Sequence, residues 1–275
     1  GRASGVCEWL LLNSRLPFEG SVFAGFGYND PAVWASPNVL ERIAAVAALM
    51  RSGVVFEEAG TEQFAYWPGE PVRLGARVRA FGVSNSEDEV ALDVLSGTRV
   101  IWSERVKRRL GHGITKIEFV WQPPSSPGEY TFRARLVGGQ DGHADEIRHD
   151  FAVLDPTPAP QSAFIVARDG DFWLNGEKWY PVGMNYWPLY VSGMDQADYW
   201  PGWLRDGSYA PKLVKRDLVQ MADMGINLVS IQNPPPAEYR NLLDFIRLCK
   251  GHGIFVNLYV GQASPLAFND AELKM

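Results

Sequence analysis

The fold is decided by residues 164–260, which open with FIVARDGDFWLNGEKWYPVGMNYWP at residues 164–188. Two short strands, at residues 164–167 and 172–174, are expected around Arg168-Asp169-Gly170. The dipeptide Asn175-Gly176 suits a two-residue hairpin turn. These features predict a small β lid just before the next strand.

After this lid the sequence alternates between strands and helices. Strands are expected at Tyr180–Met184, Leu228–Ile231 and Phe255–Val260. The first lacks polar alternation, as a strand covered on both faces would, and Leu228–Ile231 is expected to be buried as well. Helices are indicated between them by apolar side chains at helical spacing. These stripes are Val214, Leu218 and Met221, followed by Leu242, Ile246 and Cys249. Strands joined in this way by helices and short connections pair in parallel, with right-handed crossovers.

The sequence signals at the ends of these two helices agree with this interpretation. Gly225 stands where a left-handed residue usually ends a helix. Pro235 and Pro236 can open the second helix, which is expected to stop at Gly251.

Residues 168–188 (RDGDFWLNGEKWYPVGMNYWP) and residues 215–232 (KRDLVQMADMGINLVSIQ) together resemble a known family. They are similar to the opening of the (β/α)8 barrel, or TIM barrel, in the cellulase-like and β-galactosidase-like glycoside hydrolases that cleave with two glutamates. The resemblance implies that residues 164–275 form the first three βα units of such a barrel. It also implies hydrolysis of O-glycosidic bonds. Where the second strand of these enzymes commonly ends in Arg, this chain has Gln232.

A block of strands precedes the barrel-like region. Apolar residues alternate with polar ones from Val72 to Ala80, and the same period recurs in several later segments separated by Gly, Pro, Ser and Asn turns. This pattern predicts an immunoglobulin-like β-sandwich over residues 61–155. The three alternating prolines that follow predict a stiff linker at residues 156–163.

The first sixty residues suggest a different origin. Buried strands are expected at Trp9–Leu12 and Ser21–Phe26, and a helix is expected from Ser36-Pro37 to Gly53. A fragment this small cannot bury both of its faces alone. Residues 1–60 are therefore interpreted as the α/β remnant of a preceding domain, which makes the chain multidomain.

Composition limits the classes of partner. The chain has 275 residues and a net charge of −6, which argues against nucleic acid and anionic membranes as partners. Its one basic cluster is expected to be a solvated strand edge or hairpin; the cluster comprises Arg105, Lys107, Arg108 and Arg109. No apolar run approaches the roughly 18 residues of a membrane span.

Cysteines and histidines suggest no special chemistry. Cys7 and Cys249 are interpreted as free thiols. The four histidines show no ligand spacing on one element, so neither a metal site nor a cofactor is expected. The sequence has no Asn-x-Ser/Thr acceptor, which favours a bacterial origin. A secreted or periplasmic location is slightly favoured over a cytoplasmic one.

Binding residues are expected at the carboxyl ends of the barrel strands, where such folds place their sites. The long loop after the first strand contributes aromatic rings together with Asp195, Asp198 and Asp206, and an equal alternative for each ring is that it packs the loop onto the barrel rim. The side chains at the strand ends are amides and aromatic rings, which suit sugar hydroxyls and the C–H faces of pyranoses. This set favours a neutral carbohydrate and does not by itself suit bond cleavage. The expected substrate-binding residues are Asn185, Tyr186, Trp187, Trp200, Trp203, Gln232, Asn233 and Tyr259.

No catalytic residue is expected within this chain. Glycosidic cleavage needs two carboxyl groups, and the resemblance implies that they are glutamates after the fourth and seventh strands. Glu238 and Glu272 are expected to be solvated helix charges. A whole barrel takes about 250 residues. Besides a carbohydrate substrate, the expected partner is therefore the rest of a barrel, from a longer parent protein, another chain or copies of this one.

Two functions from different classes stay open at this point. The first is part of a glycoside hydrolase acting on a neutral oligosaccharide or polysaccharide. The second is a non-catalytic carbohydrate-binding or structural protein with a degenerate barrel.

Overall fold

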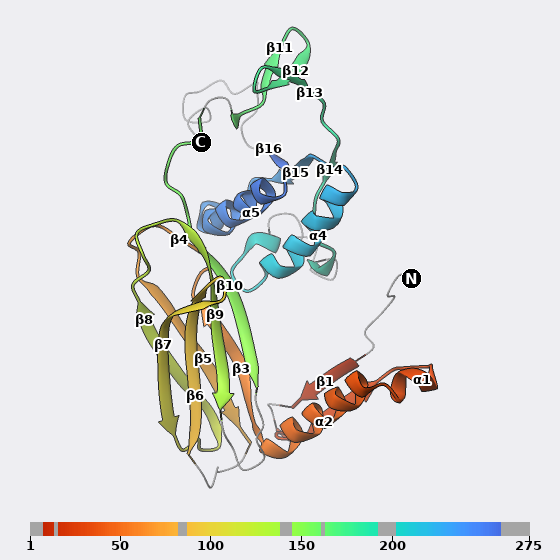
Figure 1. The fold of residues 1–275 in the computed structure, drawn as a ribbon, viewed down its shortest axis with the longest axis vertical. Helices are drawn as coiled ribbons and strands as arrows, with labels where there is room; N and C mark the ends of the chain where they lie inside the picture. The colour runs from red at the N-terminus through yellow and green to blue at the C-terminus, as the bar shows by residue number, and fades with distance from the viewer. Residues whose placement is uncertain are drawn as a thin grey trace. The chain divides into compact units, whose positions relative to one another are not determined.

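The computed structural model describes residues 8–13, 16–81, 87–137, 145–160, 163–191 and 202–259 (Figure 1). Its elements are mostly strands, with few helices. The chain divides into two compact units. The first comprises residues 1–62, 71–122 and 129–151, and the second comprises residues 63–70, 123–128 and 152–275. In the described part of the chain, no helix combines the length and the apolar character needed to cross a membrane.

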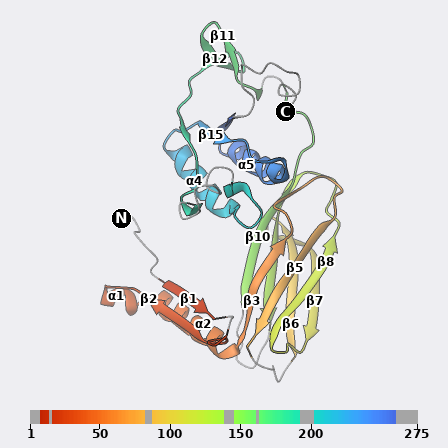
Figure 2. The same cartoon turned by 180° about the vertical axis from the view of Figure 1, so that it is seen from behind.

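The first unit begins with a β-hairpin and two helices. Strands β1 (Glu8–Leu12) and β2 (Val22–Phe26) pair antiparallel, and helices α1 (Pro31–Trp34) and α2 (Pro37–Ser52) follow. Figure 2 shows α2 beside the hairpin. The helix expected from the sequence is confirmed, because Ser36 caps its start and Gly53 ends it with a left-handed φ of 62°.

The expectation that both strands of this hairpin are buried is wrong. Trp9, Leu11 and Phe23 are each about half exposed. A two-stranded hairpin has two faces, and only one of them is directed toward helix α2. Glu8 forms an ion pair with Arg42 of α2, so the hairpin face that carries Glu8 points toward the helix. Because successive side chains of a strand alternate between its faces, Trp9, Leu11 and Phe23 point away from the helix.

Two sheets make up the next part of the chain. One has the strand order β3-β5-β8, and the other has the order β4-β10-β9-β6-β7. Strand β4 and the last two residues of β10 belong to the second unit. The bounds are β3 Val54–Thr61, β4 Ala65–Tyr66, β5 Val72–Ala80, β6 Asp88–Ser96, β7 Arg99–Arg108, β8 Gly113–Trp121, β9 Gly128–Val137 and β10 Glu146–Val153.

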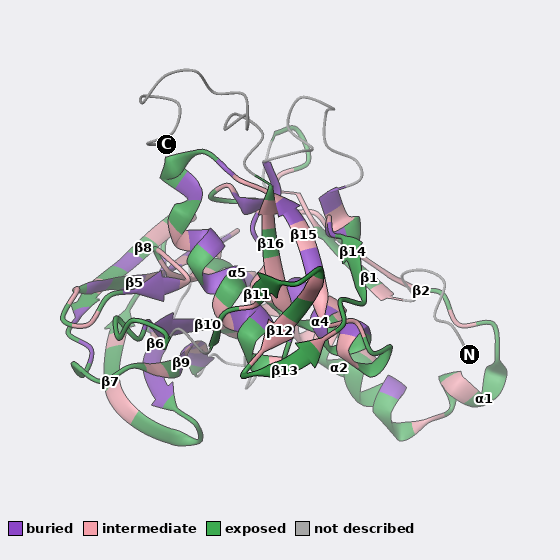
Figure 3. Cartoon of the chain, turned by 90° about the horizontal axis from the view of Figure 1, so that it is seen from above, coloured by how far each residue is buried: buried purple, intermediate pink, exposed green. Residues whose placement is uncertain are grey.

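The alternation read from the sequence is confirmed in these sheets. Every second residue of β5, from Val72 to Ala80, is buried; Figure 3 colours the chain by burial. The inner faces meet through aromatic rings. Trp121 of β8 lies 5.6 Å from Tyr130 and 6.1 Å from Phe151, between ring centroids.

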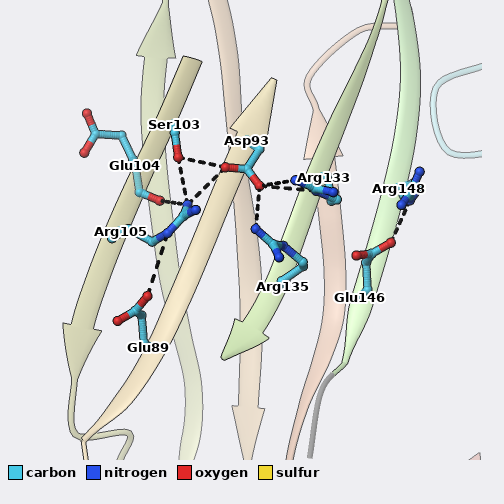
Figure 4. Close-up of polar contacts among 9 residues, drawn as sticks. All are labelled: Glu89, Asp93, Ser103, Glu104, Arg105, Arg133, Arg135, Glu146 and Arg148. Carbon is cyan, nitrogen blue, oxygen red and sulfur yellow. Dashed lines mark hydrogen bonds and ion pairs between the residues drawn. The ribbon is translucent and has the colours of Figure 1, made fainter. Parts of the chain in front are cut away.

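A charged cluster occupies the outer face of the second sheet (Figure 4). The carboxylate of Asp93 in β6, only 1% exposed, accepts hydrogen bonds from Ser103 at 2.7 Å and from Arg105 at 3.0 Å. Arg133 donates twice, at 3.2 and 2.8 Å, and Arg135 donates at 3.0 Å. Burial alone raises the pKa of Asp93, but these hydrogen bonds outweigh it and hold the pKa far below its ordinary value.

The basic cluster predicted as a solvated edge lies on and just after β7. This strand is at one end of its sheet, and most of its residues are exposed. Arg105 is the member that also reaches inward, to Asp93.

The second unit contains the predicted β lid. Strands β11 (Val166–Arg168), β12 (Asp171–Leu174) and β13 (Glu177–Trp179) form an antiparallel sheet. The turn between β12 and β13 has φ values of 53° at Asn175 and 83° at Gly176. Positive φ at both central residues identifies the hairpin turn that Asn-Gly favours, so this prediction is confirmed.

The strand and helix alternation is also confirmed. Strands β14 (Gly183–Asn185), β15 (Leu228–Gln232) and β16 (Phe255–Tyr259) are parallel neighbours in one sheet. Helix α4 (Pro211–Asp223) and helix α5 (Tyr239–Gly251) connect them. Short 3₁₀ turns η2 (Leu189–Val191), η3 (Gly202–Leu204) and η4 (Pro236–Glu238) complete the connections.

The helices pack their apolar stripes on one face of this sheet. The predicted stripe of α4 is buried together with Val229 and Ile231. In α5 the rotation differs from the prediction: Ile246 is exposed. Phe245 and Leu248 take its place in the core, beside Leu242 and the free thiol of Cys249.

Candidate functional site

The face of the parallel sheet that points away from α4 and α5 carries a set of aligned polar side chains. The register pairs Asn185 with Ser230 and Ser230 with Asn257, and it pairs Gln232 with Tyr259. Paired residues in a parallel sheet point to the same side. Since Val229 and Ile231 point into the helix-covered core, these five side chains lie on the opposite side, which we call the polar face.

The polar face has its own hydrogen bond. The Asn257 side chain donates from Nδ2 to Ser230 Oγ at 3.2 Å. Tyr259 is 59% exposed, and Asn185 and Asn257 are exposed as well. The strands β14, β15 and β16 contain no Asp, Glu, Lys, Arg or His. The polar face therefore offers amides, a hydroxyl and a phenol, but no charge.

Two features hold the strands of this face in register. Gly183 approaches β15 so closely that a Cβ atom there would lie 2.9 Å from the Leu228 carbonyl oxygen. The side chain of Asn227 accepts from the Val182 amide at 2.8 Å and donates to the Tyr180 carbonyl at 2.9 Å.

Asn227 also accounts for a difference from the sequence prediction. Its side chain takes backbone groups that a longer β14 would use for pairing, so β14 begins at Gly183 rather than at Tyr180. Tyr180 and Val182 are exposed. In the described structure, the expectation of a strand covered on both faces is therefore wrong for this segment.

Three of the predicted binding residues come together on the polar face, namely Asn185, Gln232 and Tyr259. Asn233 follows directly, and its backbone amide donates to the Tyr259 carbonyl at 3.0 Å. Trp187 is half-buried and packs against the core below α4 and α5. Trp200 lies outside the residues that the structure describes.

Tyr186 and Trp203 are placed differently from the other predicted residues. Both are buried in the core, with Trp203 only 1% exposed. Trp203 meets Tyr186 at 5.7 Å and Phe245 at 5.1 Å, both edge to face. Tyr186 stacks on Phe245 at 5.8 Å. Among the described residues, this packing covers both rings.

Sequence reasoning missed Ser230 and Asn257. The signal was present, because Leu228, Ser230 and Gln232 alternate with two buried apolar residues in β15. An alternation with a period of two indicates a strand with one polar face and one buried face, rather than a strand that is buried on both faces. The expectation that Leu228–Ile231 is a buried strand assigns no polar face to it, and in this respect the expectation is wrong.

The expectation of a solvated charge at Glu238 is wrong. Its side chain is buried, the residue being 8% exposed, and its Oε1 lies 3.4 Å from Arg205 Nε. Within the described part of the chain, its Oε2 has no hydrogen-bond partner. Burial raises the pKa of Glu238, and the charge of Arg205 offsets part of that rise. Glu272 lies outside the described residues.

Other carboxylates of the second unit are engaged on the helix side of the sheet. Asp217 of α4 accepts from the Tyr186 hydroxyl at 3.2 Å. Asp244 of α5 accepts from the Tyr209 hydroxyl at 2.8 Å and from Arg247 at 2.8 Å. Among the described residues, no three His, Cys, Asp or Glu side chains gather closely enough to hold a metal ion.

Comparison with known proteins gives only distant structural likeness. No protein-family model matches this sequence, and no curated protein matches it either. Similar solved structures include the β-glucuronidase of Parabacteroides merdae, with 16% identity and a TM-score of 0.34. The β-D-mannosidase of Dictyoglomus thermophilum has 14% identity and a TM-score of 0.38. A cycloisomaltooligosaccharide glucanotransferase of a Paenibacillus species has 12% identity and a TM-score of 0.32.

The chain spans about a quarter of the length of these proteins. The aligned regions cover 74%, 75% and 75% of this chain and 23%, 24% and 27% of the respective neighbour. At these TM-scores the likeness assigns no residue role to this chain.

Proposed function

We propose that this chain is part of a glycoside hydrolase that acts on O-glycosidic bonds of a neutral oligosaccharide or polysaccharide. In this proposal the chain supplies substrate-binding residues, and the catalytic carboxylates lie outside it. The observation that carries the proposal is the polar face, where Asn185, Ser230, Asn257, Gln232 and Tyr259 are aligned without a charged side chain. Such groups can hydrogen-bond neutral hydroxyls and stack on a sugar ring.

We further propose that the second unit contains the opening of a (β/α)8 barrel, with β14, β15 and β16 as its first three strands. The parallel pairing, the connecting helices and the β lid before β14 support this assignment. The motif resemblance of residues 168–188 and 215–232 supports it as well. The polar face then becomes the lumen side of the barrel, and Gln232 and Tyr259 lie at its carboxyl edge.

The proposal extends to the rest of the chain. The two sheets that contain β3 to β10 are assigned to an immunoglobulin-like sandwich, expected over residues 61–155, to which β3 also contributes. Residues 156–163 are proposed as the linker, and residues 1–60 as the remnant of a preceding α/β domain. These assignments rest on the strand patterns and the proline spacing rather than on the neighbours.

The proposed partner is the remainder of a barrel. Among the described residues, β14 and β16 each pair with one strand only, namely β15. A parallel strand with a free edge can accept another strand there. Further βα units from a longer parent protein, from a second chain or from copies of this chain would fill both edges.

The enzymatic part of the proposal is tested with the complete gene product. We expect hydrolysis of at least one substrate in a panel of neutral aryl glycosides. If nothing in the panel is cleaved while neutral oligosaccharides still bind, the non-catalytic alternative with a degenerate barrel is correct.

The binding part is tested on the polar face itself. We expect Asn185→Ala, Ser230→Ala and Asn257→Ala each to weaken binding of cellotetraose or mannotetraose, measured by calorimetry. Gln220→Ala is the matched control, because Gln220 is an exposed amide on α4. Tetragalacturonic acid, which is anionic, is expected not to bind. Equal losses for Gln220→Ala and the three face variants would refute a role for the polar face.

A further inference from the structure

The side chain of Tyr186 is fixed in the core directly beside the polar face. Its ring stacks on Phe245 at 5.8 Å with an interplanar angle of 4°, and it meets Trp203 edge to face at 5.7 Å. Its hydroxyl donates to Asp217 Oδ2 of α4 at 3.2 Å. Tyr186 lies between Asn185 and Trp187, which are both predicted binding residues. A direct binding role would require its side chain to point toward the polar face, whereas it points toward the helices.

The backbone at Tyr186 is tied down as well. Its amide donates to the Ser230 carbonyl at 3.0 Å, which extends the β14–β15 pairing by one residue. Successive side chains of an extended chain point to opposite sides. An inward Tyr186 therefore holds Asn185 on the polar face.

We infer that Tyr186 is a positioning residue of the proposed sugar site, acting through Asp217 and Phe245 on the orientation of Asn185. This inference rests on the proposed function for the meaning of the site, but the geometry that it invokes exists without sugar. The hydroxyl fixes the ring in the plane of the stack, and the ring fixes the backbone that carries Asn185. Removing the hydroxyl alone keeps the stack and releases the polar anchor.

Tyr209 provides a matched control within the same core. It is buried like Tyr186, and its hydroxyl donates to the carboxylate of Asp244 at 2.8 Å. The change Tyr209→Phe thus removes the same kind of hydrogen bond from the same core. Tyr209 is not adjacent to Asn185 in the chain, and it belongs to the segment that leads into α4.

The first experiment follows the side-chain amide of Asn185 by nitrogen-15 NMR in the 275-residue chain without sugar. The resonance is assigned by its loss in Asn185→Asp. We expect Tyr186→Phe and Asp217→Asn to shift or broaden it in the same way, with no further change in the double variant. Tyr209→Phe should leave it in place. A resonance that ignores Tyr186→Phe, or that responds equally to Tyr209→Phe, overturns the inference.

The second experiment measures binding of cellotetraose or mannotetraose. We expect Tyr186→Phe to weaken binding by about tenfold, as for the loss of one well-placed contact, and Tyr209→Phe to have no such effect. Equal urea unfolding of the two variants excludes a general loss of structure as the cause. If neither sugar binds to the unaltered chain, the proposed function fails while the NMR result still decides the positioning role.

Discussion

The cluster around Asp93 gives a prediction whose size can be worked out from the structure. Replacing Asp93 by Asn keeps the shape of the side chain but removes its charge. One carboxylate oxygen accepts three N–H donors, two from Arg133 at 3.2 and 2.8 Å and one from Arg135 at 3.0 Å. If the new amide places its NH₂ group at this position, that donor faces the N–H donors of Arg133 and Arg135. If it places its oxygen there, its NH₂ group faces Ser103 and Arg105, and their hydrogen bonds are lost.

The expected loss is smaller than a sum over these bonds. A hydrogen bond to a charged group contributes about 1.5–3 kcal/mol, so three would total roughly 4.5–9 kcal/mol. The side chains of Arg133 and Arg135 are 18% and 34% exposed, so water recovers part of that sum. We therefore expect Asp93→Asn to lower the free energy of unfolding by about 3–5 kcal/mol, the range for removing one partner of a buried ion pair.

The assay has to separate the two compact units of the chain. Urea unfolding gives the overall stability, and hydrogen exchange of peptides from β6 and β9 reports on the sheet that contains Asp93. Glu89→Gln is the matched control, because Glu89 lies on the same face of β6 and is more exposed. It pairs with Arg105 at 3.7 Å and Lys107 at 3.5 Å, and its loss should cost at most about 1 kcal/mol.

The pH dependence has a definite sign. The pKa of Asp93 is lowered by folding from its ordinary value of 3.8. Its contribution to stability is therefore complete above that value and is lost as the pH falls toward the lower folded pKa. The stability gap between the unaltered chain and Asp93→Asn should be constant near neutral pH and shrink below 3.8. A gap that matches Glu89→Gln, or that widens on acidification, would refute the reasoning.

Three further predictions concern the second unit, all measured by urea unfolding together with exchange of β14 and β15 peptides. Gly183→Ala should destabilise the sheet by about 1–3 kcal/mol, because the new methyl would lie 2.9 Å from a backbone oxygen of Leu228; unchanged exchange in β14 would contradict this. Asn227→Ala should cost about 1–3 kcal/mol, since the two hydrogen bonds from its side chain to the backbone of Tyr180 and Val182 are lost, and protection should fall first at residues 180–182. Arg240→Met should cost less than about 1 kcal/mol despite a contact with Glu70, because both side chains are roughly one-third exposed; a larger loss would mean that the Ala65 carbonyl contact dominates.

Local sequence signals predicted the elements of this chain well where one physical cause dominates. The Asn175-Gly176 turn follows from the positive φ that these two residues tolerate. The cap at Ser36 and the left-handed end at Gly53 fixed both ends of α2. The alternation of β5 follows from burial on one side only.

The errors come from contacts between segments, which no local pattern contains. Ile246 has the spacing of a core residue, but the packing of α5 is set by Phe245, whose ring meets Tyr186 and Trp203. The hairpin formed by β1 and β2 has the composition of a buried sheet. It is exposed because only one of its faces is directed toward α2.

The candidate site was predicted only in part, because its register and burial also depend on contacts between segments. Asn185, Gln232 and Tyr259, which were predicted from their positions near strand ends, lie on one face of the described sheet, although the register pairs Asn185 with Ser230 rather than with Gln232. The register, however, adds Ser230 and Asn257, and neither stands at a strand end. Burial then separates Tyr186 and Trp203 from the predicted set, and this depends on the rotation of α5.

Three carboxylates of the second unit bear on how the proposed function would divide binding and cleavage between this chain and the rest of the protein. Asp217 and Asp244 each accept a hydrogen bond from a buried tyrosine hydroxyl, and Glu238 lies beside Arg205. A group that protonates a glycosidic oxygen must reach that oxygen and exchange its proton, whereas Asp217 and Asp244 are engaged with tyrosine hydroxyls on the helix side of the sheet. The polar face of the described strands has no ionisable group besides Tyr259. In the proposed function the polar face holds a neutral sugar, and cleavage requires two carboxyl groups from outside the described strands.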